Sequence, residues 1–368
     1  MKKMFRIIII SIHILFLISC NQNTIHYEND LYKIKLFGEV KSYDYSEFGI
    51  DSDSIKNINK RKLFRSNYRV SFDSKGNQVE HKVFKEDGNT IHSRRREYDK
   101  KGNLISTAVY DSLGTMNWRS ELKYDNHSNL IERNNFNANR ELYSKEIFKY
   151  NRNNDLVERV VIDRGDETYK ELLIYDNEGN RIEQNFFNKN SEGVFYLEIQ
   201  NLFKFDSAGN KTERVLLKMN EFKQALVISY LEKFDLDGNI IEHISYSEDG
   251  SEFRRTTHEY DADNNLVEKV RYFNGELKEK KKYLFDIVGN KIEENIFWNK
   301  KRVVLNKFEY DENGNLVNLQ SQKIYGDLTR NNNRSYEFEY DENGSWVKRN
   351  EFQNGILISI TERKVEYF

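Results

Sequence analysis

The sequence predicts an all-β fold, in which tandem antiparallel β-hairpins form an extended, twisted or spiralling sheet. Two observations support this prediction. An aromatic residue followed by Asp or Asn recurs about every 26 residues, and self-similarity at such a period is typical of repeat architectures. Apolar and polar residues also alternate beside each copy, which is the pattern of a strand with one buried face.

Each repeat is anchored by one aromatic residue. The anchors are Phe72, Tyr98, Tyr124, Tyr150, Tyr175, Phe205, Phe234, Tyr260, Phe285, Tyr310 and Tyr340. The spacing varies by a few residues, so the extra residues must lie in loops between the strands.

A tight turn follows each anchor. In Tyr310-Asp311-Glu312-Asn313-Gly314-Asn315, the Asp side chain can accept bonds from backbone amides, and the Gly supplies the positive φ of a type I turn with a G1 bulge. Small polar residues that tolerate this conformation, Ser128, Asn154 and Asn264, replace Gly in three copies. The expected structural turn glycines are Gly76, Gly102, Gly179, Gly209, Gly238, Gly289, Gly314 and Gly344.

Strands flank each turn. A β-branched residue stands seven positions after every anchor, and an apolar residue stands twelve positions after nearly every one. Seven and twelve differ in parity, so an uninterrupted strand cannot bury both, and we expect a β-bulge between them. A second turn closes each unit; Asn274-Gly275 and Asn354-Gly355 are typical of two-residue hairpin loops.

The N-terminal segment has the pattern of a secretory leader. Residues 1–6 carry three cations and residues 7–18 are almost wholly apolar, a stretch too short for a spanning helix. Leu17-Ile18-Ser19-Cys20 resembles the lipobox at which bacterial lipoproteins are cleaved and acylated on cysteine. An ordinary signal peptide or an uncleaved anchor, with an incidental cysteine, is the alternative.

The expected organisation is a signal peptide over 1–19, a lipidated tether over 20–35 and a repeat array over 36–368. Acyl chains such as palmitate on Cys20 would anchor the protein to the membrane of the bacterial cell envelope. The outer membrane is the expected location, with its periplasmic and surface faces left open.

Composition narrows the partner classes. The 58 basic and 60 acidic residues nearly cancel, so nothing indicates nucleic-acid binding. The single cysteine stands at the leader, so the mature chain cannot form an internal disulfide or a cysteine-based zinc site. No cofactor is expected.

The repeat unit, an aromatic-Asp-x-x-Gly-Asn run followed by apolar residues, resembles the YD repeat of the RHS and teneurin-type family over about residues 36–368. The resemblance implies an antiparallel sheet that spirals into a shell around a C-terminal toxin domain. This chain contains no proline, and so lacks the Asp-Pro signature of the toxin members, and its last repeat ends at Phe368. We therefore expect an open, stand-alone array, with the irregular start and the charged strand 362–366 serving as caps.

Residues that could carry chemistry are better explained by the repeats. Asp235, Asp237 and Asn239 have the initial spacing of a calcium loop, but Gly and Glu do not follow at the required positions. A Glu follows the β-branched position in most units, as a structural position would, whereas glycosidases need one local pair. We therefore expect no catalytic residue, no metal site and no enzyme activity.

Trp298, beside a turn, is the candidate for stacking on a sugar ring, whereas Trp346 is expected in the core.

These observations favour a membrane-anchored, non-catalytic binding or interaction scaffold for a carbohydrate or protein ligand. The alternative is an immunity protein that neutralises a toxin, because runs such as Tyr272-Phe273-Asn274-Gly275-Glu276-Leu277 resemble antitoxin-type repeats. A hydrolase is the third hypothesis.

Overall fold

The computed structural model describes residue 36 and residues 38–50, 60–62, 67–220 and 222–368. The expected signal peptide, the tether and Cys20 lie outside the described residues. In the described part of the chain, 25 strands form one sheet, and every pairing between them is antiparallel. None of the described segments forms an apolar helix of membrane-spanning length.

The strands follow one another along the chain as a continuous meander. The first half of the sheet consists of β1 Val40–Ile50, β2 Lys60–Lys62, β3 Tyr68–Phe72, β4 Gln78–Phe84, β5 Thr90–Tyr98, β6 Leu104–Tyr110, β7 Met116–Tyr124, β8 Leu130–Asn137, β9 Leu142–Tyr150, β10 Leu156–Asp163, β11 Asp166–Tyr175 and β12 Arg181–Lys189. The second half consists of β13 Phe195–Phe205, β14 Lys211–Asn220, β15 Ala225–Phe234, β16 Ile240–Tyr246, β17 Glu252–Tyr260, β18 Leu266–Phe273, β19 Glu276–Phe285, β20 Lys291–Trp298, β21 Lys301–Tyr310, β22 Leu316–Tyr325, β23 Leu328–Tyr340, β24 Trp346–Gln353 and β25 Ile356–Tyr367.

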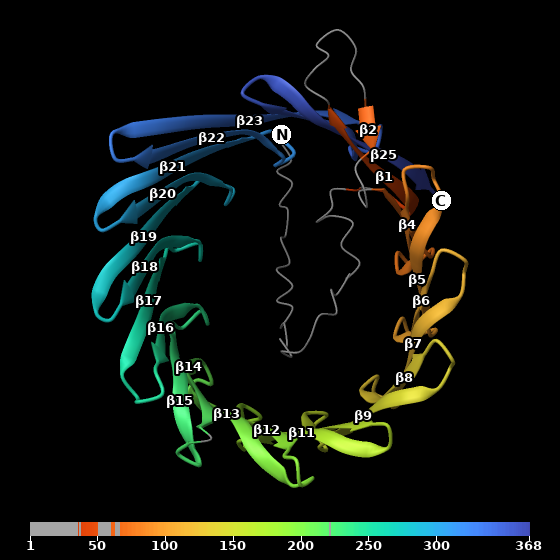
Figure 1. Ribbon diagram of the computed structural model, residues 1–368, viewed down its shortest axis with the longest axis vertical. Helices are drawn as coiled ribbons and strands as arrows, with labels where there is room; N and C mark the ends of the chain where they lie inside the picture. Colours follow the sequence, from red (N-terminus) through yellow and green to blue (C-terminus); the bar gives the residue numbers. More distant parts are fainter. Residues whose placement is uncertain (1–35, 37, 51–59, 63–66, 221) are drawn as a thin grey trace, which may run out of the picture.

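The sheet closes into a barrel, so the expectation of an open, extended array is wrong. Strand β1 pairs with β25 from Val40↔Tyr367 to Gly49↔Ser359, and on its other edge with β3 and the short β2. Figure 1 shows the complete ring, in which β25 lies beside β1. The charged segment 362–366 therefore does not cap an open edge. All five of its residues pair with β1, and Glu362 also pairs with Lys348 of β24, so the sheet keeps no free edge here.

The curvature that permits closure comes from bulges. The register shifts at the start of the strand after each anchor: Tyr98 pairs with Leu104 but Glu97 pairs with Ser106, which leaves Ile105 unpaired. A second shift lies beside the other turn: Tyr110 pairs with Met116 but Val109 pairs with Trp118, which leaves Asn117 unpaired. Bulges bend a strand and increase its twist. The expected bulge is present in this strand, but it falls at the seventh position after the anchor and not between the seventh and the twelfth. Because it recurs with each repeat, the hairpins curve steadily in one direction.

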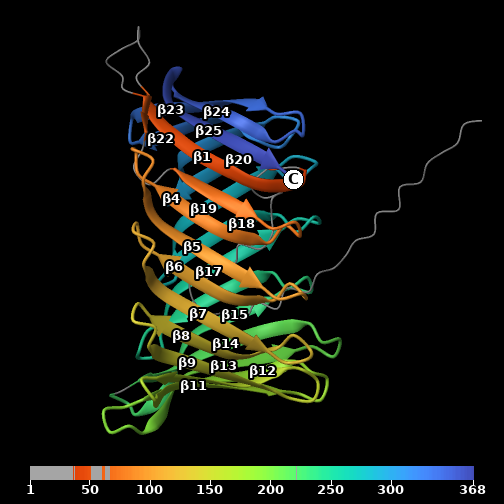
Figure 2. The ribbon, with the colours of Figure 1, turned by 90° about the vertical axis from the view of Figure 1, so that its right-hand side faces the viewer.

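The turns divide between the two edges of the barrel. The turns that follow the anchors, such as 99–103 and 125–129, lie on one edge, here called the YD rim. The turns that close each unit, such as 111–115 and 299–300, lie on the other edge, called the second rim. Figure 2 shows the tilted strands running between these edges.

The best-defined hydrophobic core lies where β1 meets β3 and β25. Leu36, Val40, Tyr43 and Val70 form its buried cluster, and Leu36 and Val40 are each 1% exposed. Elsewhere the anchors and their neighbours are half-buried on a single-layer sheet. Fully burying a Val side chain contributes roughly 1.5–3 kcal/mol, so this cluster stabilises the junction directly.

Candidate functional site

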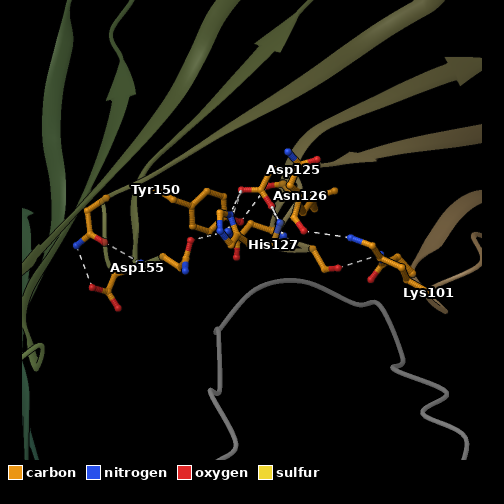
Figure 3. Close-up of polar contacts among 12 residues, drawn as sticks. Lys101, Asp125, Asn126, His127, Tyr150 and Asp155 are labelled. Atoms are coloured by element: carbon orange, nitrogen blue, oxygen red, sulfur yellow. Dashed lines mark hydrogen bonds and ion pairs between the residues drawn. The ribbon is translucent and has the colours of Figure 1, made fainter.

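The Asp residues of the YD rim are occupied by the turns themselves (Figure 3). Asp125 Oδ1 accepts bonds from the backbone amides of His127 and Asn129 at 2.8 and 2.9 Å, and Oδ2 accepts from Asn129 Nδ2 at 2.9 Å. The bond from the Asn129 side chain is the main cause that lowers the pKa of the Asp125 carboxyl. Neighbouring turns are also tied together, since Lys101 Nζ donates to the carbonyl oxygen of Asn126 at 3.1 Å.

The turn glycines have the geometry that the turn requires. Gly102, for example, has a φ of 91°, and Ser128, Asn154 and Asn264 take φ values of 66°, 67° and 62° in its place. A positive φ is also found at Gly76, Gly179, Gly209, Gly238, Gly289, Gly314 and Gly344.

Asp235, Asp237 and Asn239, which have the initial spacing of a calcium loop, have the same arrangement as the other turns. Asp235 Oδ1 accepts from the amides of Asp237 and Asn239 at 3.1 and 2.8 Å, and Asp235 Oδ2 accepts from Asn239 Nδ2 at 3.1 Å. The carboxylate therefore points back at its own backbone. Within the described residues, no group of three His, Cys, Asp or Glu side chains is placed to hold a metal ion.

Anchor tyrosines link each repeat to the one before it. The hydroxyl of Tyr150 donates to the carbonyl oxygen of Leu130 at 2.9 Å (the tyrosine is labelled in Figure 3), and burial raises its pKa. Phenylalanine anchors cannot make this bond. The same bond is made by Tyr98 to Gln78, Tyr124 to Leu104, Tyr175 to Leu156, Tyr260 to Ile240 and Tyr310 to Lys291.

The repeated glutamates are held between cations on neighbouring strands. Glu132 contacts Lys123 Nζ at 2.7 Å and Lys145 Nζ at 2.8 Å, and the bond from Lys123 is the main cause that lowers its pKa to about 2. Glu158 and Glu242 are bracketed in the same way. Each of these three carboxylates ties three strands together.

The two tryptophans of interest lie in different surroundings. Trp346 is 6% exposed, packs edge-on against Phe338 at 6.0 Å, and lies under the guanidinium of Arg363 at 3.3 Å from the ring centroid. Trp298 is 57% exposed on the second rim. Its ring is therefore available to a partner.

The first and last strands of the described array together form a twelfth repeat. Val40 pairs with Tyr367 and Ser42 with Glu366, with a bulge between them, which is the register that Leu104 and Ser106 make with Tyr98 and Glu97. The amide of Phe368 donates to the carbonyl oxygen of Glu39 at 3.0 Å, as Asp99 does to Asn103.

Residues at this split turn repeat the chemistry of the others. Gly38 has a φ of 90°, and a Cβ there would lie 3.1 Å from the Tyr367 ring. The Tyr367 hydroxyl donates to Asp341 Oδ2 at 2.6 Å, the bond that Tyr340 makes to Asp311. The pairing of β1 with β25 is called the seam below.

A pocket of about 630 Å³ lies at the seam. This volume is within the range of small-molecule sites, roughly 300–1,000 Å³. Its lining residues come from β1, β3, β4, β24, β25 and adjoining turns. They are Asp44, Tyr45, Ser46, Asn67, Tyr68, Phe84, Gly88, Val347, Lys348, Glu362, Arg363 and Lys364.

Aromatic and charged groups are fixed in this pocket. Tyr45 stacks on Tyr68 at 4.7 Å between ring centroids, and burial raises the pKa of both hydroxyls. Burial likewise lowers the pKa of Arg363 to about 10. Asp44 is paired with Arg69 through two bonds of 2.7 and 2.6 Å. The pocket therefore combines rigid aromatic walls with donors and acceptors, as sugar-binding sites do.

Sequence reasoning missed this pocket because its residues belong to no single repeat. One signal was present: Tyr367 follows Tyr340 by 27 residues (367 − 340), within the spacing of the other anchors. Tyr367 lacks the Asp or Asn that follows the other anchors, because Phe368 stands after it.

Comparisons with known proteins give distant matches. No protein-family model and no curated protein matches the chain. Among solved structures, the TcdB2-TccC3 complex aligns with 86% of this chain at 10% identity and a TM-score of 0.28, and its TEV-containing form with 80% at 14% identity and 0.28. A porin-like protein from Bacteroides uniformis aligns with 89% of this chain and 98% of its own at 10% identity and a TM-score of 0.20. The chain spans about a fifth of the length of the toxin chains, 20% and 19%. At these identities and TM-scores no function is transferred.

Proposed function

We propose that this chain is a non-catalytic binding protein of the bacterial cell envelope that recognises a carbohydrate in the seam pocket. The pocket is the observation that carries the proposal. It lies at the seam, where β1, β3, β4, β24 and β25 bring together residues that belong to no single repeat. The Tyr45–Tyr68 pair gives the pocket an aromatic wall against which a sugar ring can pack, and the surrounding Asn, Ser, Glu and Lys groups offer hydrogen bonds to hydroxyls.

The envelope location rests on the lipobox-like sequence that ends at Cys20. Acyl chains on this residue would hold the protein on a membrane without a spanning helix. Growing cells with a clickable palmitate analogue tests this: label should appear on the wild-type chain and be absent from Cys20→Ser. Label that persists in the variant would contradict the anchor.

Phe84 provides a matched test of the pocket. Phe84 and Phe187 stand at the same repeat position, twelve residues after their anchors, but only Phe84 lines the pocket. Phe84→Ala should abolish binding on an array of bacterial envelope glycans, including peptidoglycan fragments and capsular oligosaccharides, whereas Phe187→Ala should bind like the wild type. Wild-type protein that binds no glycan, or equal losses in both variants, would count against the proposal.

The toxin-neutralising alternative is tested separately, by expressing this chain with toxins encoded beside its gene. Protection of the cells that survives Phe84→Ala would favour it over glycan binding.

A further inference from the structure

Four consecutive hairpins expose apolar side chains at the second rim. They are β18–β19, β20–β21, β22–β23 and β24–β25, which lie side by side in the ring (Figure 1). At their tips Phe273 is 42% exposed, Trp298 57%, Tyr325 57%, Leu328 68% and Ile356 62%. Apolar groups gathered in this way mark an interaction surface.

Cations accompany these side chains. Lys300, Lys301 and Arg302 lie on the β20–β21 hairpin, and Lys323 and Arg330 on β22–β23, all of them exposed. In the described part of the chain, none of the five forms an ion pair, although Arg330 lies over the Tyr325 ring at 6.0 Å. Two nearby acidic groups are engaged elsewhere, since Glu276 pairs with Lys278 at 2.7 Å and Glu279 with Arg271 at 3.4 Å. Asp327 is exposed at the tip of β22–β23, so the five cations face one uncompensated carboxylate. These five cations and the five apolar residues above are called the apolar-basic rim.

The shape of this surface selects its partner. Its residues stand at or beside hairpin tips on one edge of a closed ring, so several tips can meet a flat surface together. Small ligands need a concave site, and the seam pocket is lined by other residues. Leu328 and Ile356 also have no ring on which a sugar could stack.

We propose that the apolar-basic rim docks on an anionic lipid surface. Trp and Tyr side chains favour the interface between headgroups and acyl chains, where an apolar ring and a polar tip are both satisfied. Trp298, Tyr325 and Leu328 enter this layer, and the unpaired cations face lipid phosphates. The contact is separate from glycan binding in the seam pocket and does not require a lipid on Cys20.

Vesicle binding by the full chain tests the proposal. The vesicles are phosphatidylcholine alone and phosphatidylcholine mixed with phosphatidylglycerol. The rim variant is Lys300→Glu/Lys301→Glu/Arg302→Glu. Its control, Lys75→Glu/Lys100→Glu/Lys101→Glu, makes the same charge change on the opposite rim. All chains share one N-terminal segment, so differences between them report on the rims.

We expect the wild type and the control to bind the mixed vesicles about tenfold more tightly than the rim variant, with binding weakened by added salt. Circular dichroism checks that each variant is folded. Should the rim variant unfold, Lys300→Gln/Lys301→Gln/Arg302→Gln replaces it, and a loss of about fivefold is expected. No preference for phosphatidylglycerol, or equal losses from both rims, would overturn the proposal.

Indole fluorescence distinguishes docking on a membrane from binding to a soluble polyanion. On mixed vesicles the emission should shift to shorter wavelength and be quenched by brominated lipid, and Trp298→Phe should remove both effects. Binding that leaves Trp298 in water would assign the rim to a soluble polyanion and refute docking on lipid. Retention of these effects in Phe84→Ala distinguishes the rim from the seam pocket.

Discussion

The backbone amide of Phe368 donates a hydrogen bond to the carbonyl oxygen of Glu39 at 3.0 Å and thereby joins the two ends of the array. The turn at this point has the register of its neighbours but is made by two separate segments of the chain. Eleven continuous repeats and one divided repeat therefore complete the ring. Closure leaves the pairing edges of β1 and β25 satisfied, which protects the sheet from adding strands of other molecules.

A disulfide across the seam tests closure. Ser42 and Glu366 are register partners, and such Cα atoms lie roughly 4.5–5.5 Å apart, within the range that a disulfide can span. In a Cys20→Ser background, Ser42→Cys/Glu366→Cys should oxidise readily and raise the free energy of unfolding by up to about 6 kcal/mol, because the bond closes nearly the whole chain. Mass spectrometry and urea unfolding measure both effects.

Ser71→Cys/Glu366→Cys is the control for this experiment. Ser71 lies on the far side of β1, so two strand spacings, roughly 9–10 Å, separate it from Glu366. This pair should stay reduced. An open array would leave both pairs reduced.

Much of the local structure follows from the sequence, because the signals are local. The Asp and Gly of each YD turn and the Asn274-Gly275 and Asn354-Gly355 loops are set by backbone chemistry within a few residues. The loops at these two pairs were predicted correctly: Asn274 and Gly275 have φ values of 47° and 76°, and Asn354 and Gly355 have 51° and 81°. The bulge was predicted from the parity of two positions.

Closure could not be predicted from the same signals, because it depends on the sum of small bends over the whole array. A slightly flatter repeat would leave β1 and β25 apart. The seam pocket depends on closure and so was missed with it. Arg363 on β25 and Tyr45 on β1 are register partners only in the closed ring. Trp298 could be identified because its exposure depends only on its place beside a turn.

The Asn299-Lys300 turn offers a stabilising substitution. Asn299 and Lys300 have φ values of 46° and 69°, and a Lys side chain there crowds its own backbone. Lys300→Gly should raise the free energy of unfolding by about 1 kcal/mol, measured in urea. The reciprocal change, Gly275→Lys, should lower the free energy of unfolding by a similar amount. A Cβ at Gly275 would meet nothing within 4 Å, so the only cost is the backbone strain of a positive φ. A destabilised Lys300→Gly variant would refute this account.

The buried anchor tyrosines should make the fold sensitive to alkali. Burial raises the pKa of Tyr98, Tyr124 and Tyr150 above the ordinary value of 10.0. A raised pKa means that the neutral hydroxyl is favoured in the folded state, so its stabilisation is complete below pH 10 and is lost as the pH rises above it. Urea midpoints should therefore fall steeply above pH 10.

Tyr124→Phe isolates one such residue. It removes the bond to the Leu104 carbonyl and should cost about 1 kcal/mol at pH 8. Its stability should also fall less steeply above pH 10 than that of the wild type. Tyr325→Phe, at a site 57% exposed, should match the wild type at every pH. An identical alkaline slope in wild type and Tyr124→Phe would contradict the assignment.

Protonation of Glu132 should lower the free energy of unfolding at acid pH. Its pKa is lowered from 4.5 to about 2, chiefly by the bond from Lys123. A depressed pKa means that stability is present above pH 4.5 and is lost as the pH falls towards 2. Glu132→Gln should cost about 1 kcal/mol at pH 7, a modest figure because the Lys123 side chain is 62% exposed and solvent screens the pair. The difference from wild type should vanish near pH 2 and shrink in 1 M salt, since the Debye length there is about 3 Å.

Glu192→Gln, on an exposed turn, serves as the control and should change nothing. A penalty for Glu132→Gln that stays constant from pH 7 to pH 2 would show that the side chain packs and does not act through its charge.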